Sequence, residues 1–261
     1  MSNGDNITKI KRNDEILRVL YENGHVEVRS VAEKFGVSEA TIRRDLRTMA
    51  DEGLVELVYG GATLPRRGNY SLRVRETRNV EAKRIIGKLA ADLVQNGASL
   101  FVDSGTTCGC MVPNLFSKRD LSVITNSNSV ATQIGENTGF NVLQLGGRFR
   151  FDRMDSVGPF SQMVIEQLSG YQAFIGADGL SLDIGITSTD IETAHLYRAA
   201  IKHAGETIVL ADHTKFSAPA LYKIIDLEAI NRIVTDKPPS DEWVRRLEAN
   251  GIDLVIPETT P

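Results

Sequence analysis

The sequence predicts an α/β protein with two domains: a small helix-rich domain that ends in a β-hairpin, and a larger domain built on a mostly parallel β-sheet. Over the first 50 residues apolar side chains recur at helical spacing, and a Gly-Gly turn follows at residues 60–61. Beyond residue 81 short apolar runs alternate with helical stretches, which is typical of a parallel sheet covered by helices. We expect the first domain at 1–62, a linker at 63–80 and the second domain at 81–261, which suits a chain of 261 residues.

Composition excludes several classes of protein. With 41% hydrophobic and 25% charged residues, the chain is typical of a globular protein and unlike a disordered or collagen-like one. No apolar run approaches the ~18 residues of a membrane span, and residues 1–13 lack the apolar core of a secretion signal. Cys108 and Cys110 are too few for a disulfide framework or a four-ligand zinc site. We therefore expect a cytoplasmic protein with no membrane contact, no metal and no cofactor.

The net charge of −4 conceals a difference between the two ends of the chain. Residues 1–80 hold 14 Lys and Arg against 12 Asp and Glu, whereas residues 81–261 hold 16 against 22. Residues 66–78 hold five arginines and one acid, Glu76. Positive charge gathered at one end favours nucleic acid as the partner of that end.

Three helices and a hairpin are expected in the first domain, at residues 13–21, 31–35, 39–50 and 54–61. Asn23-Gly24 and Gly36 end the first two helices, and Ser38 caps the third. The third helix buries Ile42, Leu46 and Met49, which share one face on a helical wheel.

The opposite side of the third helix carries arginines. An isolated helix with three arginines is usually a solvated surface helix. Here a tight turn and two helices precede it and a Gly-Gly hairpin follows, an order that matches a winged helix-turn-helix. Arginine can bind guanine through two hydrogen bonds or clamp phosphate, and hydroxyls at the helix start can bind the DNA backbone. The expected DNA contacts are Ser38, Thr41, Arg43, Arg44 and Arg47.

Strands and helices alternate in the second domain. We expect strands at 99–102, 122–125, 141–145, 173–176, 207–211 and 232–235, and helices at 81–95, 108–116, 160–168 and 191–204.

Polar loops follow several of these strands. Residues 103–107 (Asp-Ser-Gly-Thr-Thr) and 125–128 (Thr-Asn-Ser-Asn) each supply hydroxyls and backbone N–H groups, which suits a phosphate or another anion. Parallel strands end at the same edge of the sheet, where open α/β sheets bind ligands, although turns use such residues anyway.

Later strand ends carry charged side chains. Arg148, after Gly146-Gly147, can meet a ligand anion or another subunit. Lys215 can neutralise a phosphate, while Asp178 or Asp212 can accept hydrogen bonds from sugar hydroxyls. Asp212 and Lys215 are three residues apart and can equally form a weak surface ion pair.

The chain resembles the DeoR family of bacterial regulators of sugar metabolism. Residues 37–46 (Val-Ser-Glu-Ala-Thr-Ile-Arg-Arg-Asp-Leu), with 52–54 and 60–62, match the family's N-terminal signature. Matches continue at 103–107, 125–127, 146–147, 156–158, 173–179, 192 and 212–216, so the resemblance covers nearly the whole chain. In place of the family's usual arginine before the wing turn stands Leu57-Val58-Tyr59, so wing contact would be weaker, or made by Tyr59 or the linker arginines.

The resemblance implies a sensor domain similar to ribose-5-phosphate isomerase, and a repressor released from operator DNA by a phosphorylated sugar. A winged helix that reads paired half-sites implies a homodimer or homotetramer. Lys83 matches a lysine often implicated in inducer response, and Glu192 lies where the isomerases place a catalytic carboxylate. The expected effector-binding residues are Lys83, Asp103, Ser104, Gly105, Thr106, Thr107, Asn126, Ser127, Arg148, Asp178, Glu192, Asp212 and Lys215.

The alternative hypothesis is that the protein is an enzyme similar to a phosphosugar isomerase. Aldose–ketose isomerisation needs a base, for which Glu192 is the candidate, and a group that stabilises the enediolate. The isomerases precede that carboxylate with a glycine-rich segment containing lysine, but residues 183–190 have one glycine and no lysine. We therefore expect binding without catalysis. A third hypothesis is that the chain is a DNA-binding protein whose second domain serves only for assembly.

Overall fold

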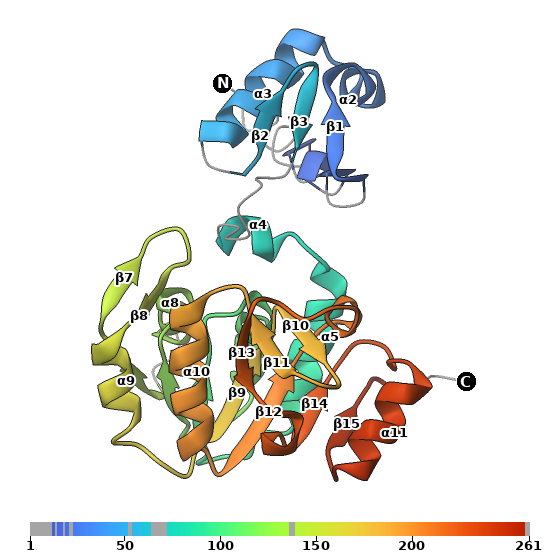
Figure 1. Ribbon diagram of the computed structural model, residues 1–261. Helices are drawn as coiled ribbons and strands as arrows, with labels where there is room; N and C mark the ends of the chain where they lie inside the picture. The colour runs from blue at the N-terminus through green and yellow to red at the C-terminus, as the bar shows by residue number, and fades with distance from the viewer. Residues whose placement is uncertain are drawn as a thin grey trace. The chain divides into compact units, whose positions relative to one another are not determined.

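The computed structural model describes residues 12–13, 15–17, 19–20, 23–51, 54–63, 72–135 and 139–258 (Figure 1). The chain divides into two compact units, Met1–Arg78 and Asn79–Pro261. Each unit has a hydrophobic core of its own, and each is described separately below.

The first unit is a winged helix-turn-helix. The described residues of 12–20 are helical, and β1 (His25–Glu27), α2 (Val28–Phe35), α3 (Glu39–Asp51), β2 (Glu56–Val58) and β3 (Gly61–Thr63) follow. The strands form an antiparallel sheet in the order β1-β3-β2. The sequence predicted the helices and the hairpin but not β1. A Cβ on Gly61 would lie 1.9 Å from the carbonyl oxygen of Val26, so the pairing of β1 with β3 requires glycine there.

Part of the segment expected to be a linker is ordered. Leu72–Glu76 forms the short helix α4, whose Val74 is buried in the core of the first unit. The signature residues 52–53 and linker residues 64–71, including Arg66 and Arg67, lie outside the described residues.

The second unit is built on a seven-stranded parallel sheet. Its strands are β4 (Ser99–Val102), β5 (Ser122–Thr125), β6 (Asn141–Gln144), β9 (Gln172–Gly176), β12 (Glu206–Leu210), β14 (Arg232–Val234) and β15 (Asp253–Val255). They lie in the order β15-β14-β12-β9-β4-β5-β6, and each neighbouring pair is parallel. Six of the seven were predicted from their apolar runs, and β15 was not.

Helices cover both faces of this sheet (Figure 1). Side chains alternate along each strand: Phe101 enters the core that contains α10, whereas Leu100 and Val102 enter the core that contains α5. One face carries α5 (Val80–Asp92), α6 (Thr106–Gly109), α7 (Val112–Leu115) and α8 (Asn128–Gly135); the other carries α9 (Pro159–Ile165), α10 (Ile191–His203) and α11 (Asp241–Ala249). The sequence missed α8 and α11.

The helix expected at 108–116 is two helices. Pro113 is the second residue of α7 and has no N–H to donate to the preceding turn, so a continuous helix cannot run through it. The expectation of one helix was therefore wrong at this point.

The second unit also contains two smaller antiparallel sheets. β7 (Arg148–Arg150) and β8 (Asp155–Val157) form an antiparallel hairpin, and β10 (Gly179–Ser181), β11 (Gly185–Ser188) and β13 (Tyr222–Ile225) form a three-stranded antiparallel sheet. Two 3₁₀ helices, η1 (His213–Phe216) and η2 (Leu227–Ala229), complete the described elements. None of these strands was predicted, because they mix polar, charged and glycine residues and lack the continuous apolar runs that predicted the strands of the large sheet.

A buried ion pair holds α3 to the first helical segment. Asp45 is 2% exposed, and its Oδ2 accepts a 2.7 Å hydrogen bond from Nε of Arg12, which is 7% exposed. Removing one partner of such a pair leaves an uncompensated buried charge.

We predict that Asp45→Ala lowers the free energy of unfolding of the first unit by about 3 kcal/mol, because Arg12 stays buried without its partner. Far-UV circular dichroism should show the loss in urea, while fluorescence of the single tryptophan, Trp243 in the second unit, should not change. The exposed Asp51 on the same helix is the control, and Asp51→Ala should shift stability by less than about 0.5 kcal/mol. Equal effects of the two substitutions would contradict the assignment.

Candidate functional site

The turn between α2 and α3 is short and tightly held. Gly36 ends α2 in the left-handed conformation, with φ of 64°. Ser38 Oγ then accepts a 3.2 Å hydrogen bond from the backbone N–H of Thr41, and the two side-chain hydroxyls lie 2.9 Å apart. This confirms Ser38 as the cap of α3. The cap fixes the direction in which the helix leaves the turn.

The arginines of α3 are on its exposed side. Ile42, Leu46 and Met49 are buried as expected, while Arg43, Arg44 and Arg47 are exposed. Arg43 donates a 3.0 Å hydrogen bond to Glu39 one turn earlier. Such an exposed pair is weak and can open for another partner. The helix therefore presents cations on the side away from its core.

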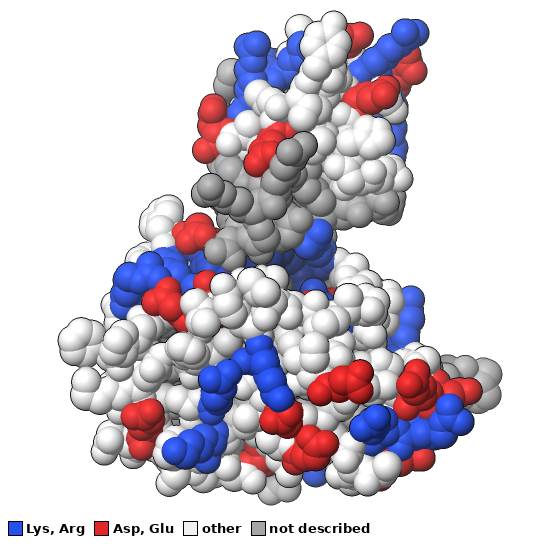
Figure 2. Space-filling model, viewed as in Figure 1, with Lys and Arg blue, Asp and Glu red and all other residues white. Residues whose placement is uncertain are grey.

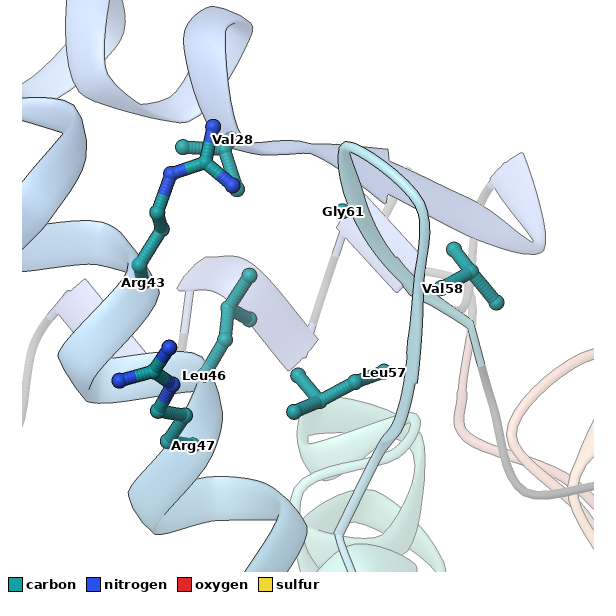
Figure 3. A pocket seen from close by; sticks show the side chains of 7 residues that line it. All are labelled: Val28, Arg43, Leu46, Arg47, Leu57, Val58 and Gly61. Atoms are coloured by element: carbon teal, nitrogen blue, oxygen red, sulfur yellow. The ribbon is translucent and has the colours of Figure 1, made fainter.

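A groove separates α3 from the wing (Figure 3). Arg43 and Arg47 line it from the helix, and Leu57 and Val58 line it from β2. The wing tip itself is Tyr59, whose side chain is fully exposed. The groove is thus cationic on the helix side and apolar on the wing side.

In the second unit, the polar loops gather at the carboxyl ends of the parallel strands. The order of the strands reverses between β4 and β9, which is where open α/β sheets bind ligands. Asp103, which follows β4, is fully buried there. Its carboxylate accepts hydrogen bonds from the backbone N–H groups of Gly105, at 2.6 Å, and Gly176, at the end of β9. Asp103 therefore ties together the two loops of the reversal point.

Ser104 leads into a buried hydrogen-bonded group. Its Oγ donates a 2.9 Å hydrogen bond to Asp155 and lies 3.1 Å from the hydroxyl of Tyr197. Burial raises the pKa of Tyr197 well above its usual value, so the phenol stays protonated. The loop after β4 is thereby bound to β8 and α10.

Arg150 neutralises the carboxylates of this group. It donates two 2.8 Å hydrogen bonds to the fully buried Asp155 and one of 2.7 Å to Asp190. Burial alone would lower the pKa of Arg150, but the hydrogen bonds and charges of Asp155 and Asp190 outweigh it and raise the pKa. Burial alone would also raise the pKa of Asp190, but bonds from Thr193 and Arg150 lower it. None of these residues was predicted as part of the site, because charged residues in a short hairpin are usually exposed to solvent.

Asn126 carries an unused acceptor. The residue is fully buried, and its Nδ2 donates to the carbonyl of Ser156 at 3.2 Å. Its Oδ1 has no hydrogen-bond partner within the described part of the chain. A buried polar atom without a partner costs free energy, so Oδ1 is available to a ligand or a water molecule. Neighbouring Ser127 instead caps α8, accepting from the N–H of Val130 at 3.2 Å.

The loop after β12 holds a second cluster. Asp212 is 2% exposed, and its Oδ1 accepts hydrogen bonds from the N–H of Thr214 at 3.0 Å and from Nδ2 of Asn79 at 3.1 Å. Burial alone would raise the pKa of Asp212, but the bonds from Thr214 and the charge of Lys215 lower it. Asp236 fixes the ring of His213 with a 2.8 Å contact to Nδ1.

Other expected effector residues are hydrogen-bonded or buried within the second unit. Asp178 accepts hydrogen bonds from the N–H and the hydroxyl of Thr189, at 2.8 and 2.9 Å. Lys83 lies on the buried face of α5 and is 5% exposed. Gly105, Thr106 and Thr107 are buried at the start of α6.

Arg148 and Glu192 pair with each other. The Arg148 side chain is 61% exposed, so this pair lies at the surface of the second unit, whereas Arg150 and Asp155 are buried. These two expected effector residues therefore bind each other in the structure.

The remaining sequence features show little chemistry. Burial, then the charge of nearby Asp103, raises the pKa of the Cys108 thiol, which opposes a redox role. The described residues contain no group of three or more His, Cys, Asp or Glu side chains placed to hold a metal ion. Among the described helices, none has the length and apolar character needed to span a bilayer.

Comparison with known proteins connects both units to one family. Residues 12–67 match the model of the DeoR-like helix-turn-helix domain, and residues 78–237 match that of the DeoR C-terminal sensor domain.

Curated relatives match over almost the full chain. The HTH-type transcriptional repressor GlcR of Bacillus subtilis is 31% identical, with 93% of this chain and 94% of the relative covered. The repressor CsqR of Escherichia coli is 27% identical (97% of each chain), and the glycerol-3-phosphate regulon repressor of E. coli is 28% identical (94% and 98%). Among solved structures, ribose 5-phosphate isomerase A of Methanocaldococcus jannaschii aligns with a TM-score of 0.39 and 16% identity, over 53% of this chain and 55% of that one.

We predict that Arg150→Met lowers the free energy of unfolding of the second unit by about 3–5 kcal/mol, because Asp155 would remain buried without a cation. Urea unfolding followed by Trp243 fluorescence measures this directly. Arg148→Met, two residues earlier on the same strand, is the matched control and should cost less than about 1 kcal/mol, since its ion pair is exposed. A small effect at Arg150 would show that the ion group is not what holds the loops together.

Proposed function

This chain belongs to the DeoR family of DNA-binding transcriptional repressors, and on that premise we propose that it controls a carbohydrate-utilisation operon. A phosphorylated sugar or a related metabolite binds the second unit and releases the protein from its operator. The protein acts as a homodimer or homotetramer, so that two recognition helices read paired half-sites.

The exposed arginine face of α3 carries the DNA-binding part of the proposal. Arg44 and Arg47 project from the side opposite the core, and Ser38 and Thr41 lie at the start of the helix. Arginines so placed can read guanine in the major groove, while the hydroxyls and the helix start bind phosphate. The apolar wing residues Leu57 and Val58 add contacts beside the groove.

We assign the effector to the carboxyl edge of the parallel sheet. Among the described residues Asn126 Oδ1 has no hydrogen-bond partner, so it offers an acceptor for a sugar hydroxyl, and the half-buried Lys215 offers a cation for a phosphate. Both support this site. Asp212 stays ionised at neutral pH because its pKa is lowered, so it accepts hydrogen bonds and does not donate them. Arg150 cancels the charge of Asp155, which would otherwise repel an anion.

Binding without turnover fits this edge better than isomerisation. Glu192 is the candidate base, and its carboxylate is paired with the exposed Arg148. Residues 183–190 contain no lysine to stabilise an enediolate. The repressors among the relatives support the same conclusion.

Asn79 offers a path from the effector to the DNA-binding unit. It is the first residue of the second unit, precedes α5, and donates its side-chain amide to Asp212. Its backbone is left-handed, with φ of 46°, a conformation that asparagine tolerates better than most residues. A ligand that rearranges Asp212 or Thr214 would therefore loosen the point where the chain enters the second unit. Such a change supplies the differential binding that allostery requires.

We predict that Arg44→Ala weakens binding to a promoter fragment about 10-fold or more at ~0.15 M salt, the loss expected for one base-reading arginine. Fluorescence anisotropy with labelled DNA measures the affinity. Arg245→Ala on α11 removes the same charge from an exposed helix of the second unit and should leave affinity within about 2-fold. Unchanged binding by the Arg44 variant would count against α3 as the recognition helix.

We predict that two substitutions separate ligand binding from release. Lys215→Ala should abolish stabilisation by a panel of aldose and ketose phosphates in a thermal-shift measurement, because the phosphate loses its cation.

Asn79→Gly keeps the left-handed backbone while removing the amide, so ligands should still stabilise the protein but no longer release DNA. Normal release by the Asn79 variant would refute the path, and a normal thermal shift with the Lys215 variant would refute the site.

A further inference from the structure

One flank of the second unit exposes large apolar side chains. Phe149, Phe151, Phe160, Met163 and Val164, here called the apolar flank, are 43%, 83%, 70%, 54% and 38% exposed. They come from the β7–β8 hairpin and from α9, which lie along the same side of the unit in Figure 1. A group of exposed phenylalanines in one region is typical of a binding surface, because soluble proteins seldom leave large apolar patches in contact with water.

The hairpin and α9, which carry the flank, adjoin one another. The rings of Phe149 and Phe151 lie edge to face with centroids 6.4 Å apart. Arg148, next to Phe149, pairs with Glu192, and a Cβ on Gly158 would lie 3.9 Å from the Glu192 carboxylate. Because Gly158 leads directly into α9, the hairpin and the start of α9 meet around this ion pair.

Helix α9 has no charged side chain on its solvent-exposed face. Helix α9 reads Pro-Phe-Ser-Gln-Met-Val-Ile and carries no charged residue, although most of its side chains are exposed. In Figure 2 white surface predominates over α9, with an acidic patch beside it. Helices that stay in water carry polar residues on the exposed face, whereas interface cores are poor in charge and rich in aromatic residues and Met.

The exposed area is sufficient for the core of a dimer interface. The exposed fractions of the three phenylalanines amount to nearly two whole side chains, or about 400 Å² at ~200 Å² for each ring. Met163 and Val164 add further apolar area. A stable interface buries about 800 Å² on each partner, of which the centre is apolar and the rim polar. The apolar flank provides such a centre, and the Arg148–Glu192 pair is a polar group at its border.

We propose that the apolar flank is the interface through which the second unit binds a second copy of this chain. An isologous contact places the same patch on both partners, so the apolar side chains of the flank can pack against their own copies. The inference rests on the proposed function, because a regulator that reads paired half-sites needs two copies. Burying the phenylalanines then joins the copies through their second units and leaves α3 of each copy free for DNA.

Sedimentation equilibrium of the full chain without DNA tests this interface. The wild-type chain should be a dimer or larger, and Phe160→Asp should weaken self-association at least about 30-fold, the effect of losing a central interface residue. Met163→Leu keeps most of the apolar volume and should weaken association by less than about 10-fold. Leu221→Asp, at a residue 79% exposed elsewhere in the same unit, is the matched control for adding a charge and should also leave association unchanged.

Trp243 fluorescence and far-UV circular dichroism establish that each variant is folded. A monomeric wild-type chain, or a folded Phe160→Asp variant that associates like wild type, overturns the interface. A folded, dissociated Phe160→Asp variant together with an unaffected Leu221→Asp variant supports it. Failure of the wild-type chain to bind promoter DNA would refute the proposed function while leaving the sedimentation result to stand alone, so the two can fail separately.

Discussion

The geometry of the second unit depends on one constraint, which is that the carboxylates buried at the carboxyl edge must be satisfied. Asp155 has no exposure to water, and Arg150 neutralises it through two hydrogen bonds. The same carboxylate accepts a hydrogen bond from the hydroxyl of Ser104, which connects the β7–β8 hairpin to the loop after β4. At the reversal point, the carboxylate of Asp103 likewise connects two loops, because it accepts hydrogen bonds from a backbone N–H group of each. An anionic ligand is compatible with this edge only while these negative charges stay compensated.

Both units use a buried charged group to fix an exposed one. In the first unit the Arg12–Asp45 pair anchors α3, while Arg44 and Arg47 on the same helix remain exposed for DNA. In the second, Asp212 binds Asn79 and Thr214 and so positions the half-buried Lys215. On the proposed function, each unit thereby presents cations to an anionic partner, the phosphates of DNA in one case and a phosphorylated sugar in the other.

Much of this architecture could be predicted from the sequence, and the failures have identifiable physical causes. Apolar runs predicted six strands of the large sheet, and the spacing of Ile42, Leu46 and Met49 predicted the buried face of α3. Helices α8 and α11 were missed because each buries only two side chains, Val130 and Ile134 in α8 and Trp243 and Leu247 in α11, too few to establish a helical period. Strands β7 and β8 were missed because their few residues include charged ones. Arg150, Asp155 and Asp45 looked like surface residues, since only the tertiary fold brings each beside its partner. The sequence likewise could not show that Arg148 and Glu192 bind each other at the surface.

On the proposed function, a cationic helix reads a specific operator, and a ligand at the sheet edge reverses this binding. It is tested most directly by the affinity of the intact protein for its own promoter fragment and for a random duplex of equal length, at ~0.15 M salt, with and without the sugar phosphate that raises its melting temperature. We expect a preference for the promoter of about 10³-fold or more without ligand, and a clear fall in that preference with ligand. Equal affinity for the two duplexes would contradict the account.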